Sequence, residues 1–219
     1  MIDPSLKKKL VHEDRWSRTY EAGENFYASE SKFEADHLSV SVEELSSAWD
    51  SWDESEKISF VNAYRSKAQF VESDERILEF LMAKGDEPVW STIASSLALH
   101  HSNKKMVLEF LLKRLTSGSE PKSNYVQALY VLGDVAALPS LHELHDQLSE
   151  QVKRAPQRQV DHWTVNDFLR CCEALGYLEK TEHYRDEIRP FLDDPDELVR
   201  IHAQNALAGP QPEEFGILE

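Results

Sequence analysis

Basic residues, glycine and cysteine are scarce in this chain of 219 residues, and it contains no long apolar run. It has 24 Lys and Arg against 40 Asp and Glu, which gives a formal net charge of −16 at pH 7. A charge of that sign repels a nucleic-acid backbone, so we expect no nucleic-acid partner. No stretch approaches the ~20 apolar residues that a membrane-spanning helix needs, so we expect no membrane partner.

Only two cysteines are present, and they are adjacent. Cys171 and Cys172 cannot form an ordinary structural disulfide, and they lack the spacing of a metal site. We expect one of the two to face the core of the protein, and a reducing, cytoplasmic setting fits best. The first lysines are not followed by the apolar segment of a secretory signal, which favours the same expectation. A content of 41% hydrophobic and 10% aromatic residues predicts a folded, globular chain.

The acidic residues are concentrated near the two ends. Residues 20–56 contain 11 acidic side chains and one lysine, and residues 190–219 contain seven acidic side chains and one arginine. Residues 57–189 are almost neutral. Two interpretations stay open: the acidic segments attract a basic protein, or they only keep the protein soluble.

From residue 41 onward the apolar residues recur at helical spacing, and no segment reads as a strand. Ser41 and Glu44 form a capping-box pattern, and Gly133-Asp134 predicts the end of one helix and the start of the next. Ser73 and Ser102 predict the starts of two further helices, and Gly85 and Gly176 predict the ends of two helices. The expected helices form consecutive pairs, and the first helix of each pair is expected to begin near 57, 87, 122, 163 and 195. This gives a repeat of 30 to 41 residues, which is typical of an α-solenoid.

Two stretches carry a family resemblance. DDPDELVRIHAQNALAG, 193–209, resembles the first helix of a HEAT repeat, with Asp194 as the helix cap and Pro195 in the first turn. LGDVAALPSLHEL, 132–144, is similar to the turn and second helix of HEAT-like repeats of the phycobilin-lyase type. A tetratricopeptide repeat is the competing interpretation, because LGYLEKTEHY, 175–184, has some of that pattern.

The resemblance implies an all-α protein, a right-handed α-solenoid of about four HEAT-like helix hairpins with end caps. We expect an irregular acidic arm over 1–40, the HEAT-like solenoid domain over 41–208 and a tail over 209–219. The tail either covers the last helix through its three apolar residues or serves as a motif for another protein; these residues are Phe215, Ile217 and Leu218. HEAT proteins mostly bind other proteins, which sets the functional expectation.

His142 and His145 share one face of an expected helix and could hold a metal ion. They lack the HExxH order of a zinc hydrolase, and both can sit on the solvated side of that helix, so we expect a surface or inter-repeat role instead. His100 and His101 are expected to close a helix in a structural role. We therefore predict no metal and no cofactor.

Trp49 and Trp52 are either the core face of the first helix or anchors for a partner. The candidate protein-binding residues are acidic positions around them and the two histidines: Asp36, Glu43, Glu44, Asp50, Asp53, Glu54, His142 and His145. A mixed-charge groove along the second helices is also expected, with Lys104, Lys105, Glu109, Arg185 and Asp186 near it.

These observations predict a non-catalytic scaffold that docks a basic protein or peptide, as an adaptor or an inhibitor such as an immunity protein. Two other hypotheses stay open. One is a metal-dependent enzyme that uses His142 and His145, and the other is an architectural subunit of a larger assembly.

Overall fold

The computed structural model describes residues 40–65, 70–117, 121–154 and 160–209. The expected arm over 1–40 (except Val40), Asp36 and the tail after Gly209 lie outside these ranges. The chain divides into two compact units, unit 1 up to Ile93 and unit 2 from Ala94, and each is described by itself. The expected solenoid domain over 41–208 stays a prediction.

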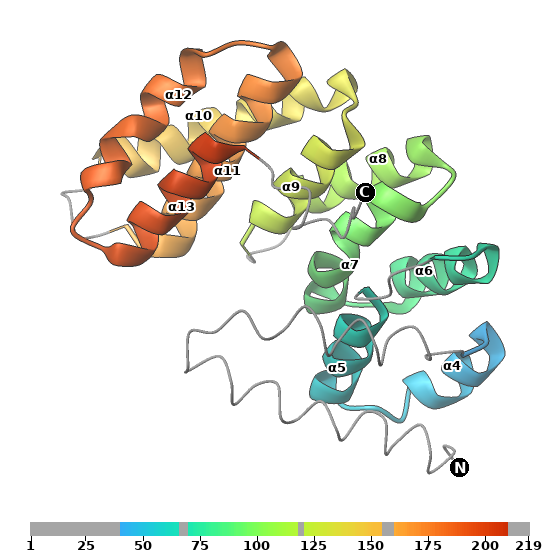
Figure 1. The fold of residues 1–219 in the computed structure, drawn as a ribbon. Helices are drawn as coiled ribbons and strands as arrows, with labels where there is room; N and C mark the ends of the chain where they lie inside the picture. The colour runs from blue at the N-terminus through green and yellow to red at the C-terminus, as the bar shows by residue number, and fades with distance from the viewer. Residues whose placement is uncertain (1–39, 66–69, 118–120, 155–159, 210–219) are drawn as a thin grey trace. The chain divides into compact units, whose positions relative to one another are not determined.

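Every regular element in the described ranges is a helix, as the sequence predicts (Figure 1). None of the described helices is long and apolar enough to cross a membrane. Unit 1 contains three complete helices and the first half of a fourth: α4 Val42–Trp49, α5 Glu54–Arg65, α6 Glu72–Lys84 and α7 Glu87–His100.

An aromatic cluster forms the core of unit 1. The Trp49 ring lies 5.9 Å from Trp52, 6.5 Å from Phe60 and 5.7 Å from Phe80, measured between ring centroids. Both tryptophans are buried, as the core interpretation predicts. The prediction that both lie on one helix was wrong, because α4 ends at Trp49 and Trp52 lies in the turn before α5.

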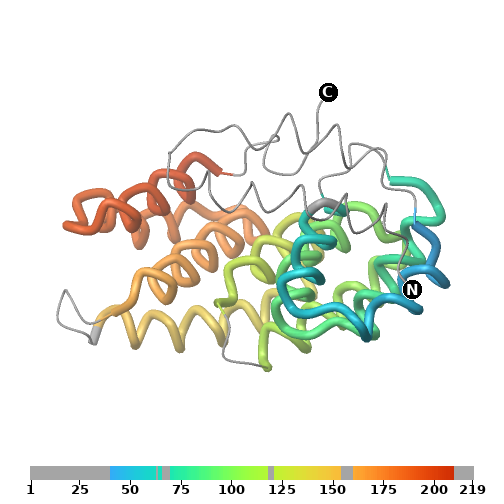
Figure 2. The backbone as a smooth tube through the Cα atoms, turned by 90° about the horizontal axis from the view of Figure 1, so that it is seen from below, coloured from blue at the N-terminus to red at the C-terminus, as the bar shows by residue number. Residues whose placement is uncertain are grey.

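Unit 2 is built around α11, His162–Glu179, which packs on α9, α10, α12 and α13 (Figure 1). In Figure 2, α10, α11 and α13 follow one another from yellow to red as neighbouring rods. The other elements are α8 Lys104–Thr116, α9 Ser123–Leu132, the 3₁₀ helix η3 Val135–Ala137, α10 Leu138–Arg154, α12 His183–Ile188, the 3₁₀ helix η4 Arg189–Asp193 and α13 Glu197–Ala208.

Helices α9 and α11 run parallel. Lys122 and Ser123, at the start of α9, donate their backbone N–H groups to Asp167 in the first half of α11, at 2.7 Å each. Tyr130 near the end of α9 meets Tyr177 near the end of α11, with ring centroids 4.4 Å apart. Because the start of α9 lies beside the first half of α11 and their ends lie side by side, the two helices point in the same direction.

Several helix boundaries confirm the sequence prediction. Ser41 and Glu44 exchange both bonds of a capping box, at 2.8 and 3.2 Å. Gly133 has a φ of 70°, a left-handed conformation that glycine adopts without strain. Asp134 then accepts the N–H of Ala136 at 2.9 Å and caps η3, which continues into α10.

Other predicted starts were wrong by one or two residues. Asp196, not Asp194, caps α13 by accepting the Leu198 N–H at 2.9 Å. Asp74, not Ser73, fixes the start of α6, because it accepts the Val71 N–H at 2.7 Å. Similarly, α8 is capped by Asn103, the residue after the predicted Ser102.

The prediction that Gly176 ends its helix was also wrong. Helix α11 continues to Glu179, and its cap is Lys180, with a left-handed φ of 56°. A Cβ at position 176 would lie 3.3 Å from the carbonyl oxygen of Thr181. Gly176 therefore allows the chain to turn closely against α11, which sequence spacing alone does not distinguish from a helix end.

Candidate functional site

Five of the predicted binding residues lie on α4, in the turn that follows it and at the start of α5. Their side chains are all exposed, and we call them the acidic face: Glu43, Glu44, Asp50, Asp53 and Glu54. The sixth predicted acid, Asp36, lies outside the described residues. Leu45, Ala48 and Trp49 form the buried side of α4, so Glu43 and Glu44 project from a packed helix.

Two acids of the acidic face also cap helices. Glu44 accepts the Ser41 N–H, and Asp53 accepts the Glu56 N–H at 2.9 Å while Glu56 accepts the Asp53 N–H at 3.1 Å. A carboxylate at a helix N-terminus also interacts favourably with the helix dipole. Glu44 and Asp53 therefore have a structural role whether or not a partner binds.

The other three acids have no ion-pair partner within the described ranges. No basic side chain there contacts Glu43, Asp50 or Glu54. The one basic residue between positions 40 and 64 is Lys57, and its ammonium lies 5.4 Å from the centre of the Trp49 ring. Lys57 is thus engaged in a cation–π contact rather than neutralising the acidic face.

The acidic excess extends over the described part of unit 1. Residues 40–65 and 70–93 contain twelve Asp and Glu side chains and four Lys and Arg side chains. Three unpaired carboxylates inside this background produce a negative electrostatic potential around α4 and the start of α5.

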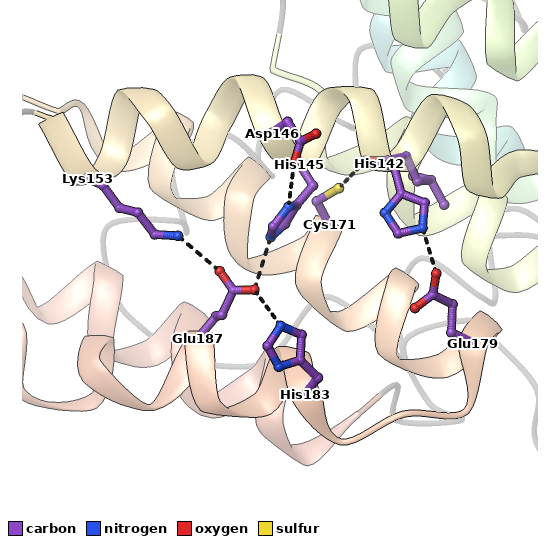
Figure 3. A network of polar contacts seen from close by, with 9 residues as sticks. His142, His145, Asp146, Lys153, Cys171, Glu179, His183 and Glu187 are labelled. Carbon is purple, nitrogen blue, oxygen red and sulfur yellow. Dashed lines mark hydrogen bonds and ion pairs between the residues drawn. The ribbon is translucent and has the colours of Figure 1, made fainter.

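The two predicted histidines belong to a network in unit 2 that joins α10 to α11 and α12 (Figure 3). His142 Nε2 lies 2.6 Å from Glu179 Oε1, and the His142 side chain is partly exposed. His145 Nε2 lies 3.5 Å from Glu187 Oε1. Glu187 also lies 3.4 Å from Lys153 Nζ, so it receives contacts from two residues of α10.

Of the surface and inter-repeat roles expected for the two histidines, the surface role is wrong for His145. This residue is buried, with its ring stacked on Phe168 at 5.4 Å and edge-on to Tyr184 at 5.4 Å. Its position on α10 explains the burial: Leu141 and Leu148, four residues before and three after it, are buried on the same face. That spacing is visible in the sequence and would have placed His145 in the core.

His142 and His145 contact different carboxylates, so they do not converge on one point (Figure 3). Among the residues that the structure describes, no three His, Cys, Asp or Glu side chains are placed to hold a metal ion. The network links α10 to its neighbours: His142 hydrogen-bonds to Glu179, His145 packs between Phe168 and Tyr184, and Lys153 forms an ion pair with Glu187.

Cys171 and Cys172 are both fully buried, which confirms core filling and goes further than the one buried thiol expected. The Cys171 thiol donates to the Leu141 carbonyl oxygen at 3.2 Å. Burial raises the pKa of both thiols well above the ordinary value, so the nucleophilic thiolate form is suppressed.

Two features of unit 2 were missed by the sequence analysis. The first is Asp167, a buried carboxylate that holds the start of α9. Burial raises its pKa, against the opposing effect of the bonds from Lys122 and Ser123. The second is a groove of about 690 Å³ where the ends of α9, α11 and α13 meet α12. Neither produces a local sequence motif.

Comparison of the chain with models of protein families, with curated proteins and with solved structures finds no match.

Proposed function

We propose that this protein is a non-catalytic protein-binding protein that docks a basic partner through the acidic face. The observation that carries this proposal is the set of three exposed carboxylates, Glu43, Asp50 and Glu54, without ion-pair partners in the described ranges. An unpaired surface carboxylate gains most when a partner supplies the missing cation, because no internal pair has to be broken first.

The rigidity of the acidic face supports the same proposal. Glu43 and Glu44 stand on α4, which has a complete capping box and a buried face that includes Trp49, and Asp50 is the C-cap residue of the same helix. The start of α5 is fixed by the reciprocal bonds of Asp53 and Glu56. Charges that are held in place before binding lose less conformational entropy when a partner docks.

We also propose that the helices form a right-handed HEAT-like solenoid. The parallel arrangement of α9 and α11, whose starts are 39 residues apart in the numbering, supports a repeated first helix. A solenoid exposes long surfaces without a deep pocket, which suits a protein-docking role better than catalysis. An adaptor or an inhibitor of a basic protein is the function that fits these features best.

The test is calorimetric titration of the full chain with an octa-arginine peptide. The test variant carries Glu43→Gln, Asp50→Asn and Glu54→Gln, which spare both capping acids. A control variant carries Glu143→Gln, Asp193→Asn and Glu197→Gln, which change the net charge equally at exposed positions of unit 2. Exposed ion pairs contribute about 0.2–1 kcal/mol each, so three of them predict binding that is about tenfold weaker in the test variant.

We expect the control variant to bind within about twofold of the unmodified protein, since its three substitutions leave every carboxylate of the acidic face in place. Equal losses in the two variants would show that net charge alone drives binding and would contradict the proposal. Binding that persists unchanged at high salt would contradict it as well, because the attraction is electrostatic.

A further inference from the structure

The groove of unit 2 lies where three helices end. Gly133 after α9, Lys180 after α11 and Gly209 after α13 all line it, and α12 closes it through Arg185 and Ile188. Its volume of about 690 Å³ is within the range of sites that hold several side chains of a ligand. It lies in unit 2 and shares no residue with the acidic face.

Exposed apolar side chains mark this groove. Tyr177 is 57% exposed and Val135 is 61% exposed, and both line it. Tyr177 stands edge-on against the buried ring of Tyr130, which restricts its motion. A fixed, exposed aromatic ring beside an apolar wall that includes Ile188 is typical of a binding surface.

Lys180 gives the groove an unpaired positive charge. Glu182 lies 3.1 Å from Arg185, which also donates to the Leu207 carbonyl oxygen at 3.0 Å, and Glu173 lies 2.8 Å from Arg170. The Lys180 ammonium has no ion pair in the described part of the chain. The left-handed φ of 56° at Lys180 favours glycine, so a lysine costs conformational energy at this position. A role for its ammonium in binding would offset that cost.

We propose that the chain's own segment 213–218, EEFGIL, binds in this groove. Phe215 packs against the Tyr177 ring, and a carboxylate of Glu213 or Glu214 pairs with Lys180. The structure describes the chain up to Gly209, which lines the groove, and the segment begins at Glu213, four residues further on. At about 3.3 Å per residue, the six residues from Gly209 to Phe215 span up to about 20 Å, so the tether to the groove is short.

Charge and composition support this occupant. The segment has two adjacent carboxylates followed by three bulky apolar residues, Phe215, Ile217 and Leu218, and the groove has an apolar wall and the ammonium of Lys180. A short tether of this kind keeps the segment at an effective concentration in the millimolar range, so weak contacts suffice. The groove is therefore a site for acidic segments with an adjacent aromatic residue, and an external peptide of that pattern competes for it.

Photo-crosslinking tests the proposal in the full chain at low micromolar concentration. With p-benzoylphenylalanine in place of Phe215, we expect intramolecular crosslinks to the groove, mapped by mass spectrometry to residues 130–135, 172–188 or 206–209. Crosslinks that map elsewhere would overturn the proposal. A covalent dimer would also overturn it, because the occupant would then be a second copy of the chain.

Charge variants of this photo-crosslinking protein separate docking from folding. We expect Lys180→Glu to lower the crosslink yield about two- to fivefold, the range of one exposed ion pair, and the matched reversal Lys105→Glu on α8 to leave it unchanged. Lys180→Gly removes the ammonium but relieves the left-handed strain, so we expect a higher melting temperature with a lower crosslink yield. Equal yields in the Lys180→Glu and Lys105→Glu proteins, or a Lys180→Gly protein that crosslinks as well as the parent, would contradict the proposal.

Discussion

Asp167 connects two helices through one buried carboxylate, and its removal gives the sharpest test of the packing of unit 2. In Asp167→Ala the backbone N–H groups of Lys122 and Ser123 lose acceptors at 2.7 Å. Residue 167 is 6% exposed, so water does not easily replace the carboxylate. Two orphaned donors at about 1–1.5 kcal/mol each predict a loss of about 3 kcal/mol in the free energy of opening the start of α9.

Amide hydrogen exchange of α9 measures this loss locally, without requiring the two units to unfold together. A loss of about 3 kcal/mol accelerates exchange of the buried amides from Tyr125 to Leu129 about a hundredfold. The control is Asp167→Asn, which keeps the shape and one acceptor oxygen. We expect Asp167→Asn to lose only about 1 kcal/mol of the same opening free energy. It keeps one acceptor, and it has no charge whose burial is unfavourable. Less than a fivefold acceleration in Asp167→Ala would refute the assigned role.

Three further outcomes follow from buried or capping groups. Because burial raises the pKa of Cys171 and Cys172, neither thiol should react with a disulfide reagent at pH 8 until the protein is unfolded; rapid labelling of the native protein would count against the buried core. Tyr64→Phe removes the hydroxyl that donates to the buried Asp74 carboxylate at 2.6 Å and should lower the free energy of unfolding of unit 1 by about 1–2 kcal/mol in urea titrations. Helix-capping bonds from Thr164 lower the pKa of Asp161. The cap therefore adds about 1 kcal/mol to the free energy of unfolding above pH 4, and this contribution disappears as the pH falls through the folded-state pKa. If the loss of stability in Asp161→Ala did not shrink in acid, this explanation would be wrong.

Local chemistry made part of the fold predictable. The capping box of Ser41 and Glu44 and the Gly133-Asp134 junction depend on residues within four positions of each other, so their sequence pattern carries the whole signal. The same holds for the exposure of Glu43 and Glu44, because α4 buries Leu45, Ala48 and Trp49 and leaves these two acids exposed.

Contacts between distant segments could not be derived in this way. Gly176 ends no helix, because its role is to admit the returning chain at Thr181. Asp167 caps a helix that starts 44 residues earlier, and no spacing rule relates the two positions. Trp52 reaches the core from a turn that helical periodicity does not reveal. The groove depends on where three helix ends meet, which the chain order alone leaves open.

The central claim is that a basic partner binds on the acidic face, and residue-resolved NMR of the full chain during titration with octa-arginine tests it most directly. We predict that the largest amide shifts fall between Ser41 and Lys57 and saturate together. Shifts that are largest in unit 2, or that spread evenly over every exposed acid of the protein, would contradict this account.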